Sequence, residues 1–255
     1  MRRLIITMLA VVVVLCVSCQ ATASDNVLKG KKILLVYGGW DGHQPRECME
    51  LLKPWLESEG AIVETSTDLN VYTDKALMQT IDLVVQCWTM GTITGEQESG
   101  LTEAVRGGMG LAGWHGGLGD AFRNNTEYQF MVGGQWVAHP GGTVDYDVDI
   151  KDKKDPVTKG LKRFHMKSEQ YYMHVDPSVK VLATTTFDGE AGAPWIKGVV
   201  MPVVWKKHYG SGRVFYSSLC HSASDFEVPE ALEIMKRGIK WAVLSRESAK
   251  TGKDK

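Results

Sequence analysis

Apolar and polar residues follow one another along the first half of this chain in a strand, helix, strand, helix rhythm. Short apolar runs bounded by charge or glycine predict buried parallel strands over residues 31–37, 61–67, 81–88 and 109–112. Apolar residues at helical spacing predict helices over 47–59, 74–80 and 96–106. This order predicts a doubly wound α/β fold with a mostly parallel sheet, and such sheets bind ligands beyond the carboxyl ends of their strands.

The regular alternation of predicted strands and helices ends after Ala121. Residues 143–150 alternate strictly, which indicates a strand with one solvated face that carries its aspartates. We expect a single domain over 28–245 and a charged, frayed tail over 246–255. The other predicted elements are a helix over 122–131, a turn-rich loop over 135–142, a strand over 180–187, a hairpin of 202–205 with 214–219, and a closing helix over 229–244.

The N-terminus has the pattern of an export signal over residues 1–23. Met1-Arg-Arg precedes an uncharged apolar run over 4–17, which is too short for a transmembrane helix. Two cleavage sites compete: Ala21-Thr-Ala23, and a lipobox-like Val17-Ser-Cys19 after which Cys19 would carry lipid. We therefore expect an exported protein that is periplasmic or anchored to the membrane through Cys19.

Charge and cysteine content narrow the class of protein further. The net charge is −1 with no basic stripe, which argues against a nucleic-acid partner. Beyond position 19 only Cys48, Cys87 and Cys220 remain, an odd number without a C-x-x-C pair, so a complete disulfide framework is excluded. Self-association into a homo-oligomer is left open.

The stretch over 108–122 is the strongest local signal. Its apolar run ends in Gly113-Trp-His-Gly-Gly117, a strand that turns sharply on glycines and feeds a helix. This is the geometry of a nucleophile elbow, but its tip is His115 rather than Ser or Cys. An imidazole there can bind a metal ion or move protons. The chain also contains no G-x-S-x-G motif and no P-loop.

The candidate functional residues lie in turns that each carry a histidine. They are His43, His115, His139 and His221, with Glu169 and Asp120 as nearby carboxylates. Three imidazoles and a carboxylate suit zinc or another divalent ion, with His115, His139 and His221 as the expected metal ligands. The same groups suit general acid–base catalysis without metal. The spacing contains no local metal motif such as H-x-x-x-H, so both interpretations stay open.

Aromatic residues stand beside three of these histidines. Trp40, Trp114 and Trp136 are candidates for stacking on a sugar ring, although tryptophan also packs in cores. Arg123 follows the His115 turn and is a candidate for binding an oxyanion or sugar hydroxyls.

Taken together and in order, several motifs resemble the ThuA-like (trehalose utilisation) family over about residues 31–243. They are residues 36–43, 113–117 with Phe122-Arg123, 132–142, 168–172, 202–205, and 209–216 continuing to His221. The sequence departs from the usual pattern at Lys154-Asp155-Pro156, where relatives often have His before the Pro. It also departs at Cys220, where Gly is common.

The resemblance implies a class I glutamine amidotransferase-like fold, which is a flavodoxin-like α/β/α sandwich with added antiparallel strands. It implies that His43, His115, His139, Glu169 and His221 line the pocket. Because His115 stands where amidotransferases hold a cysteine nucleophile, glutamine hydrolysis is excluded at this place. The implied substrates are carbohydrates, chiefly oxidised disaccharides with a 3-keto group.

Three functions follow in order of preference. The first is an enzyme that isomerises keto-sugars by His/Glu acid–base catalysis, with or without a metal ion. The second is a non-catalytic carbohydrate-binding protein at the cell surface. The third is a metal-dependent glycoside or ester hydrolase.

Overall fold

The computed structural model describes residues 26–251. The predicted export signal, Cys19 and both cleavage sites lie outside these residues. Within them, no helix is long and apolar enough to cross a membrane.

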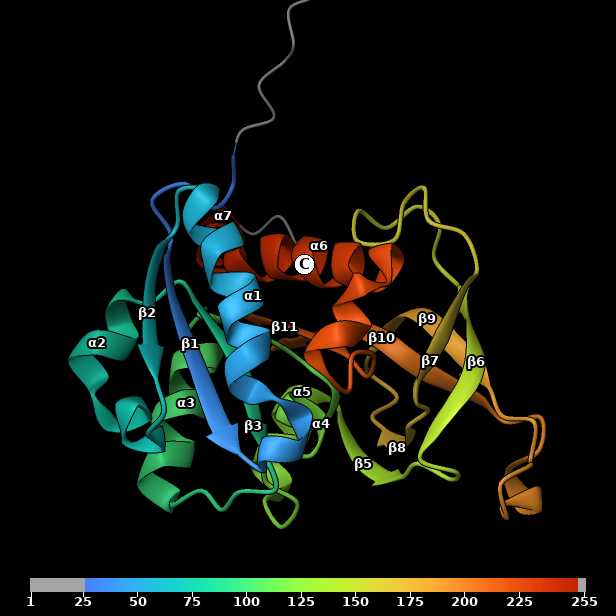
Figure 1. Ribbon diagram of the computed structural model, residues 1–255. Helices are drawn as coiled ribbons and strands as arrows, with labels where there is room; N and C mark the ends of the chain where they lie inside the picture. Colours follow the sequence, from blue (N-terminus) through green and yellow to red (C-terminus); the bar gives the residue numbers. More distant parts are fainter. Residues whose placement is uncertain (1–25, 252–255) are drawn as a thin grey trace, which may run out of the picture.

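A nine-stranded sheet forms the centre of the described chain (Figure 1). Five neighbouring strands are parallel, as the apolar runs predict. In sheet order they are β2 (Ile62–Ser66), β1 (Lys32–Gly39), β3 (Leu83–Thr89), β4 (Gly110–Trp114) and β11 (Gly212–Ser217). The expected doubly wound, flavodoxin-like α/β fold is confirmed.

Antiparallel strands extend this sheet beyond β11. In sheet order they are β10 (Val200–Tyr209), β9 (Lys180–Thr186), β6 (Thr143–Ile150) and β7 (Phe164–Glu169). Four reversals of direction separate β11 from β7, so both strands end at the same edge of the sheet. The carboxyl end of β7 therefore joins those of the parallel strands.

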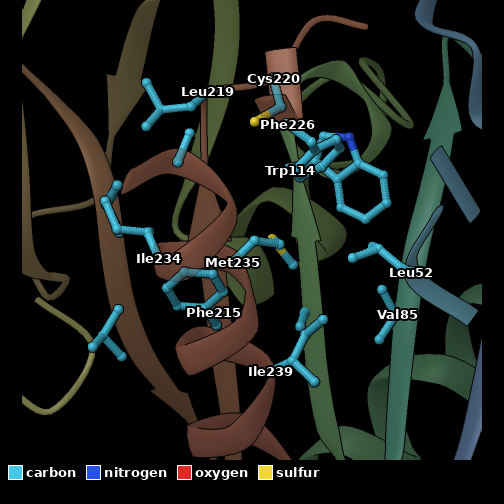
Figure 2. Close-up of a cluster of buried hydrophobic side chains, with 14 of the residues drawn as sticks. Leu52, Val85, Trp114, Phe215, Leu219, Cys220, Phe226, Ile234, Met235 and Ile239 are labelled. Carbon is cyan, nitrogen blue, oxygen red and sulfur yellow. The ribbon is translucent and has the colours of Figure 1, made fainter. Parts of the chain in front are cut away.

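Helices cover both faces of the sheet, and each face has its own core. One face packs against α1 (Pro45–Ser58) and α6 (Pro229–Val243), where Leu52 and Ile239 meet the sheet (Figure 2). The other face packs against α2 (Lys75–Thr80), α3 (Gly95–Arg106) and α5 (Thr126–Val132). Neighbouring β1 residues Leu34 and Leu35 enter opposite cores, as a strand buried on both faces requires.

Some local predictions are wrong. The helix expected over 122–131 begins only at Thr126, because Asn125 caps it by accepting a hydrogen bond from the Tyr128 amide. The expected loop over 135–142 is partly strand β5 (Gly134–Ala138), which pairs with β8 (Tyr172–Val175). The tail expected to fray is helical as α7 (Ser245–Thr251), since Arg246 binds the Ile81 carbonyl and fixes it to the domain.

Candidate functional site

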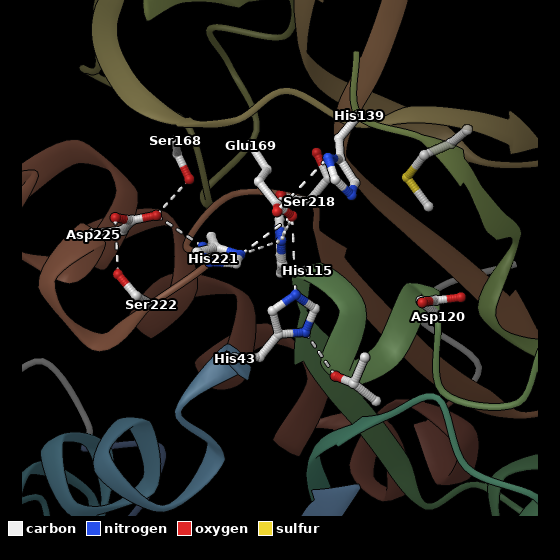
Figure 3. Close-up of polar contacts among 12 residues, drawn as sticks. His43, His115, Asp120, His139, Ser168, Glu169, Ser218, His221, Ser222 and Asp225 are labelled. Atoms are coloured by element: carbon white, nitrogen blue, oxygen red, sulfur yellow. Dashed lines mark hydrogen bonds and ion pairs between the residues drawn. The ribbon is translucent and has the colours of Figure 1, made fainter. Parts of the chain in front are cut away.

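Four side chains that are far apart in sequence meet at the carboxyl edge of the sheet (Figure 3). His43 lies in the 3₁₀ turn η1 (Asp41–His43) after β1, and His115 opens α4 (His115–Gly119) directly after β4. Glu169 is the last residue of β7, and His221 follows β11. One nitrogen or oxygen from each lies within 4.8 Å of the others. We call these four residues the His–Glu cluster.

The turn at His115 has the sharp geometry that its glycines predict. His115 itself adopts φ +46°, a left-handed conformation that is rare outside glycine. Behind it, the Tyr216 hydroxyl donates a hydrogen bond to the His115 carbonyl at 3.0 Å. A Cβ atom on Gly116 would stand 2.4 Å from Cε1 of His43, so only glycine lets the two imidazoles approach.

Glu169 is the centre of the cluster. Its Oε2 lies 3.0 Å from His115 Nε2 and 3.2 Å from His221 Nδ1, and His43 Nε2 is 4.0 Å away. His221 Nδ1 and His115 Nε2 are themselves 3.4 Å apart. Three imidazoles thus point at one carboxylate oxygen.

The outer nitrogens of two imidazoles determine what their inner nitrogens can do. His115 Nδ1 lies 2.8 Å from the Ser218 carbonyl, which can only accept, so His115 Nδ1 carries a proton. A neutral His115 therefore presents the lone pair of Nε2 to Glu169. His43 Nδ1 similarly contacts the Thr89 hydroxyl at 2.9 Å, while its Nε2 faces the cluster. Such outer contacts are typical of histidines that bind metal ions.

Burial and neighbouring charges shift the pKa values of these four groups in different directions. Burial lowers the pKa of His115, and burial together with the neighbouring imidazoles lowers the pKa of His43 to about 3. Hydrogen bonding to Glu169 raises the pKa of His221. Burial by itself would raise the pKa of Glu169. Contacts with His115 and His221 outweigh this effect and hold the pKa well below its usual value. The carboxylate is therefore ionised and the two most buried imidazoles are neutral near pH 7.

Asp225 holds two parts of the cluster together. It lies in the 3₁₀ turn η4 (Ala223–Glu227) and accepts hydrogen bonds from the His221 amide at 2.8 Å and from the Ser168 hydroxyl. Ser168 directly precedes Glu169 in β7. One carboxylate thus fixes the His221 turn against the strand that carries Glu169 (Figure 3).

His139 lies beside the cluster rather than within it. Its Nδ1 is 3.7 Å from Glu169 Oε1, too far for a hydrogen bond, and is buried without a hydrogen-bond partner. Its ring stacks over Tyr171 at 6.2 Å between centroids, and Tyr171 stacks on His115 at 3.8 Å. The His139 side chain is 36% exposed and that of His115 only 1%, so the cluster is approached from the His139 side.

The cluster fits a divalent ion of the zinc type. Ligands about 2.0–2.2 Å from a tetrahedral ion stand roughly 3.3–3.6 Å apart. The distances from the three imidazoles to Glu169 Oε2 are 3.0–4.0 Å, and all four ligand atoms lie within 4.8 Å of one another. Of the three predicted ligands, His115 and His221 are in the cluster together with His43 and Glu169. His139 lies outside it and faces the other carboxylate oxygen, so its role as a ligand stays a prediction.

The candidate sugar-binding residues have different surroundings. Trp40 is 46% exposed and its ring lies 4.8 Å from that of His43. Arg123 forms a two-pronged ion pair with buried Asp120 and stacks over Trp136 at 4.6 Å. Trp114 is buried in the core against Phe226, so the structure gives no support to substrate contact by Trp114.

Sequence reasoning missed Asp225 and Tyr171. Asp225 follows His221 by four residues, a spacing at which a carboxylate can cap the turn it follows. Tyr171 lies two residues after Glu169 within the motif over 168–172. Both residues are polar or aromatic neighbours of candidate residues in the sequence, which is the signal that points to them.

Comparisons with known proteins agree with this fold. The trehalose utilisation (ThuA) family matches residues 32–242, whereas the comparison with curated proteins found no match. A ThuA-like protein of Bacteroides uniformis ATCC 8492 is 17% identical with a TM-score of 0.70, over 83% of this chain and 91% of that one. A ThuA-like protein of Parabacteroides merdae ATCC 43184 is 21% identical with a TM-score of 0.68, over 84% and 90%.

A more distant similarity shows the fold alone. The β-galactosidase from Bacillus circulans sp. alkalophilus is 12% identical with a TM-score of 0.51, over 86% of this chain and 31% of that one. The family match, by contrast, spans nearly the whole described fold and every member of the His–Glu cluster. The chain therefore belongs to the ThuA, or trehalose utilisation, family.

Proposed function

We propose that this chain is a carbohydrate-processing enzyme that moves a proton on a keto-sugar, with the His–Glu cluster as its reacting centre. The observation that carries the proposal is the approach of His115 Nε2 to Glu169 Oε2 at 3.0 Å. Two acceptors at this distance require a shared positive charge between them, either a proton or a cation. Membership of the trehalose utilisation family supports a sugar as the substrate.

A ketone acidifies the C–H bonds beside it, so the reaction needs a base for the carbon-bound proton and positive charge near the ketone oxygen. His139 is well placed to be the base, because its side chain is the most exposed of the group, while its buried Nδ1 has no hydrogen-bond partner and faces Glu169. Glu169 Oε1 lies 3.7 Å from that nitrogen and can take over the proton after a small movement.

The four members of the cluster supply the positive charge. A divalent ion such as zinc, held by residues from among His43, His115, His221 and Glu169 with one position left for the substrate, would polarise the ketone oxygen as a Lewis acid. Thr89 and Ser218 keep the inner nitrogens of His43 and His115 pointed at Glu169. This fixed orientation lowers the reorganisation that binding and reaction require.

Aromatic residues beside the cluster suit a sugar ring. Trp40 exposes nearly half of its surface next to His43, and Trp136 borders His139 with ring centroids 5.6 Å apart. Sugars stack on such rings through their C–H faces. Arg123 is already paired with Asp120, so we assign it to holding the Trp136 ring rather than to direct substrate binding.

The experiment is incubation with a 3-keto-disaccharide in deuterated buffer, with zinc supplied. The proposal predicts deuterium at the carbon beside the ketone, read by mass spectrometry or NMR, together with an isomeric product. Neither exchange nor product under these conditions would contradict it, and sugar binding without turnover would favour the non-catalytic alternative.

Metal-dependent hydrolysis is the second candidate function, and the same cluster favours it. Hydrolytic zinc sites hold the ion with three protein ligands and keep one position open for water, so hydrolysis requires that one of the four cluster residues does not bind the ion. The two functions give different products: hydrolysis releases a free monosaccharide or alcohol without carbon-bound deuterium, whereas isomerisation incorporates deuterium into the sugar.

A further inference from the structure

The edge of the sheet opposite the His–Glu cluster carries lysines that are dispersed in the sequence. β6 ends and β7 begins at this opposite edge, so the connection over 151–163 lies there, as does the start of β1. Residues 151–163 contain six Lys or Arg and two Asp. We define the basic edge as five exposed lysines: Lys29, Lys153, Lys154, Lys159 and Lys162.

Two acidic groups near the basic edge are paired with other cations. Asp155 is buried and pairs with Lys206 at 2.5 Å and Lys180 at 2.8 Å. Glu59 pairs with Lys240 at 3.1 Å. Among residues 26–251, none of the five lysines of the basic edge forms an ion pair. Their charge is therefore directed to solvent without local compensation.

The start of the described chain lies at the same edge. Asn26 lines a cavity of about 1100 Å³ together with Glu59, Asp155 and Arg237. Arg237 also donates a hydrogen bond to the Lys159 carbonyl at 2.7 Å, which fixes the 151–163 connection beside α6. The chain before Asn26, which includes Cys19, therefore joins the domain at the basic edge.

We propose that the basic edge docks on an anionic lipid surface, with the His–Glu cluster facing away from it. Lysines attract anionic headgroups within about a Debye length, roughly 8 Å at physiological salt. A lipid on Cys19, which precedes Asn26 by only a few residues, would hold these lysines close to the membrane. The location of Asn26 favours a membrane over a nucleic acid as the anionic partner.

This arrangement has a consequence for access to the cluster. The five parallel strands have their amino ends at the basic edge and their carboxyl ends at the cluster. A domain standing on its basic edge therefore opens the His139 side to the aqueous phase, where soluble sugars diffuse. The inference does not depend on the reaction, so it stands or fails separately from the proposed function.

The test uses the chain from Ser24 onwards, which contains every described helix and strand and both cores. Sedimentation with vesicles of phosphatidylglycerol and phosphatidylcholine is compared with sedimentation with pure phosphatidylcholine. We expect binding to the anionic vesicles alone, weakening as salt is raised. The triple variant K153E/K154E/K159E should lose more than about tenfold in affinity.

The matched control is K75E/K167E/K197E, which makes the same change in net charge at three exposed lysines outside the basic edge. It should retain most of the affinity for anionic vesicles. Equal losses in both variants, equal binding to uncharged vesicles, or binding of RNA with no binding of vesicles would each overturn the proposal. Circular dichroism of all three proteins checks that they are folded.

Discussion

Glu169 Oε2 lies 3.0 Å from His115 Nε2, although the other nitrogen of His115 already donates its proton to the Ser218 carbonyl. In the neutral imidazole, therefore, a lone pair faces a carboxylate oxygen. Such a contact is repulsive unless a proton or a cation lies between the two atoms. The two neighbouring imidazoles, His43 and His221, converge on the same oxygen and make a divalent cation the better fit.

The first prediction concerns metal binding. The substitution Glu169→Gln removes the negative charge on which the three imidazoles converge and keeps the shape of the side chain. We expect zinc affinity, measured by calorimetry on protein prepared without metal, to fall by more than about tenfold. Glu190→Gln, an exposed change in the connection between β9 and β10, is the control and should bind zinc normally. Equal zinc affinity in wild type and Glu169→Gln would exclude this site.

The second prediction tests the close approach of two imidazoles. A Cβ on Gly116 would stand 2.4 Å from the His43 ring, so Gly116→Ala must displace that ring from the cluster. We expect loss of zinc affinity and turnover, with destabilisation of about 1–3 kcal/mol from overpacking. Gly95→Ala, where a Cβ meets nothing within 4 Å, is the matched control. Normal turnover by Gly116→Ala would show that His43 is dispensable.

The third prediction assigns Asp225 a positioning role. Asp225→Ala frees both the His221 turn and Ser168, so zinc affinity should fall by about 10–100-fold. The control is Asp188→Ala, which removes a comparable cap on the Glu190 amide without touching His221 or Ser168. If Asp225→Ala lowers the melting temperature but leaves zinc affinity intact, its role is structural only.

The fourth prediction concerns acid stability. Burial acts to raise the pKa of Asp176, but Lys207 and the Ser178 amide outweigh it and lower the pKa to about 2. Because the folded pKa lies below the unfolded value of 3.8, this carboxylate stabilises the fold above about pH 4. That contribution disappears as the pH falls towards 2.

Asp176→Asn should therefore lower the free energy of unfolding at pH 7 by about 1.5–3 kcal/mol. It should also flatten the dependence of stability on pH between 4 and 2. Urea unfolding followed by circular dichroism across this range measures both effects. A variant whose pH dependence matches wild type would remove Asp176 from the account of acid stability.

The parallel strands and the edge of the sheet that carries the site could be predicted from the sequence, because buried parallel strands have continuous apolar runs. That pattern placed His43, His115 and His221 at one edge, where the structure shows them together. Glu169 is a candidate from the sequence, but its place at this edge could not be derived from the pattern, since it depends on the direction of β7, four antiparallel pairings away from β11. Strand order beyond the parallel half is set by long-range packing, which local patterns do not encode.

The directions in which individual side chains point could not be predicted from the sequence either. The sequence placed Trp114 and His139 beside the site because each follows or precedes a turn. In β4 both faces are buried, so alternation cannot tell which face Trp114 takes, and it enters the core. His139 is predicted as a metal ligand and faces Oε1 of Glu169, whereas His43 faces Oε2; the sequence does not reveal which oxygen each imidazole faces.

The most direct test of the reacting centre compares deuterium incorporation into a 3-keto-disaccharide by wild type and by His115→Asn. Asparagine tolerates the left-handed backbone at this position and retains a donor for Ser218, but removes Nε2. We expect exchange by His115→Asn to slow by about 100-fold or more. The control His165→Asn changes an exposed histidine of β7 and should exchange at the wild-type rate. Undiminished exchange by His115→Asn would contradict the assignment of the His–Glu cluster as the reacting centre.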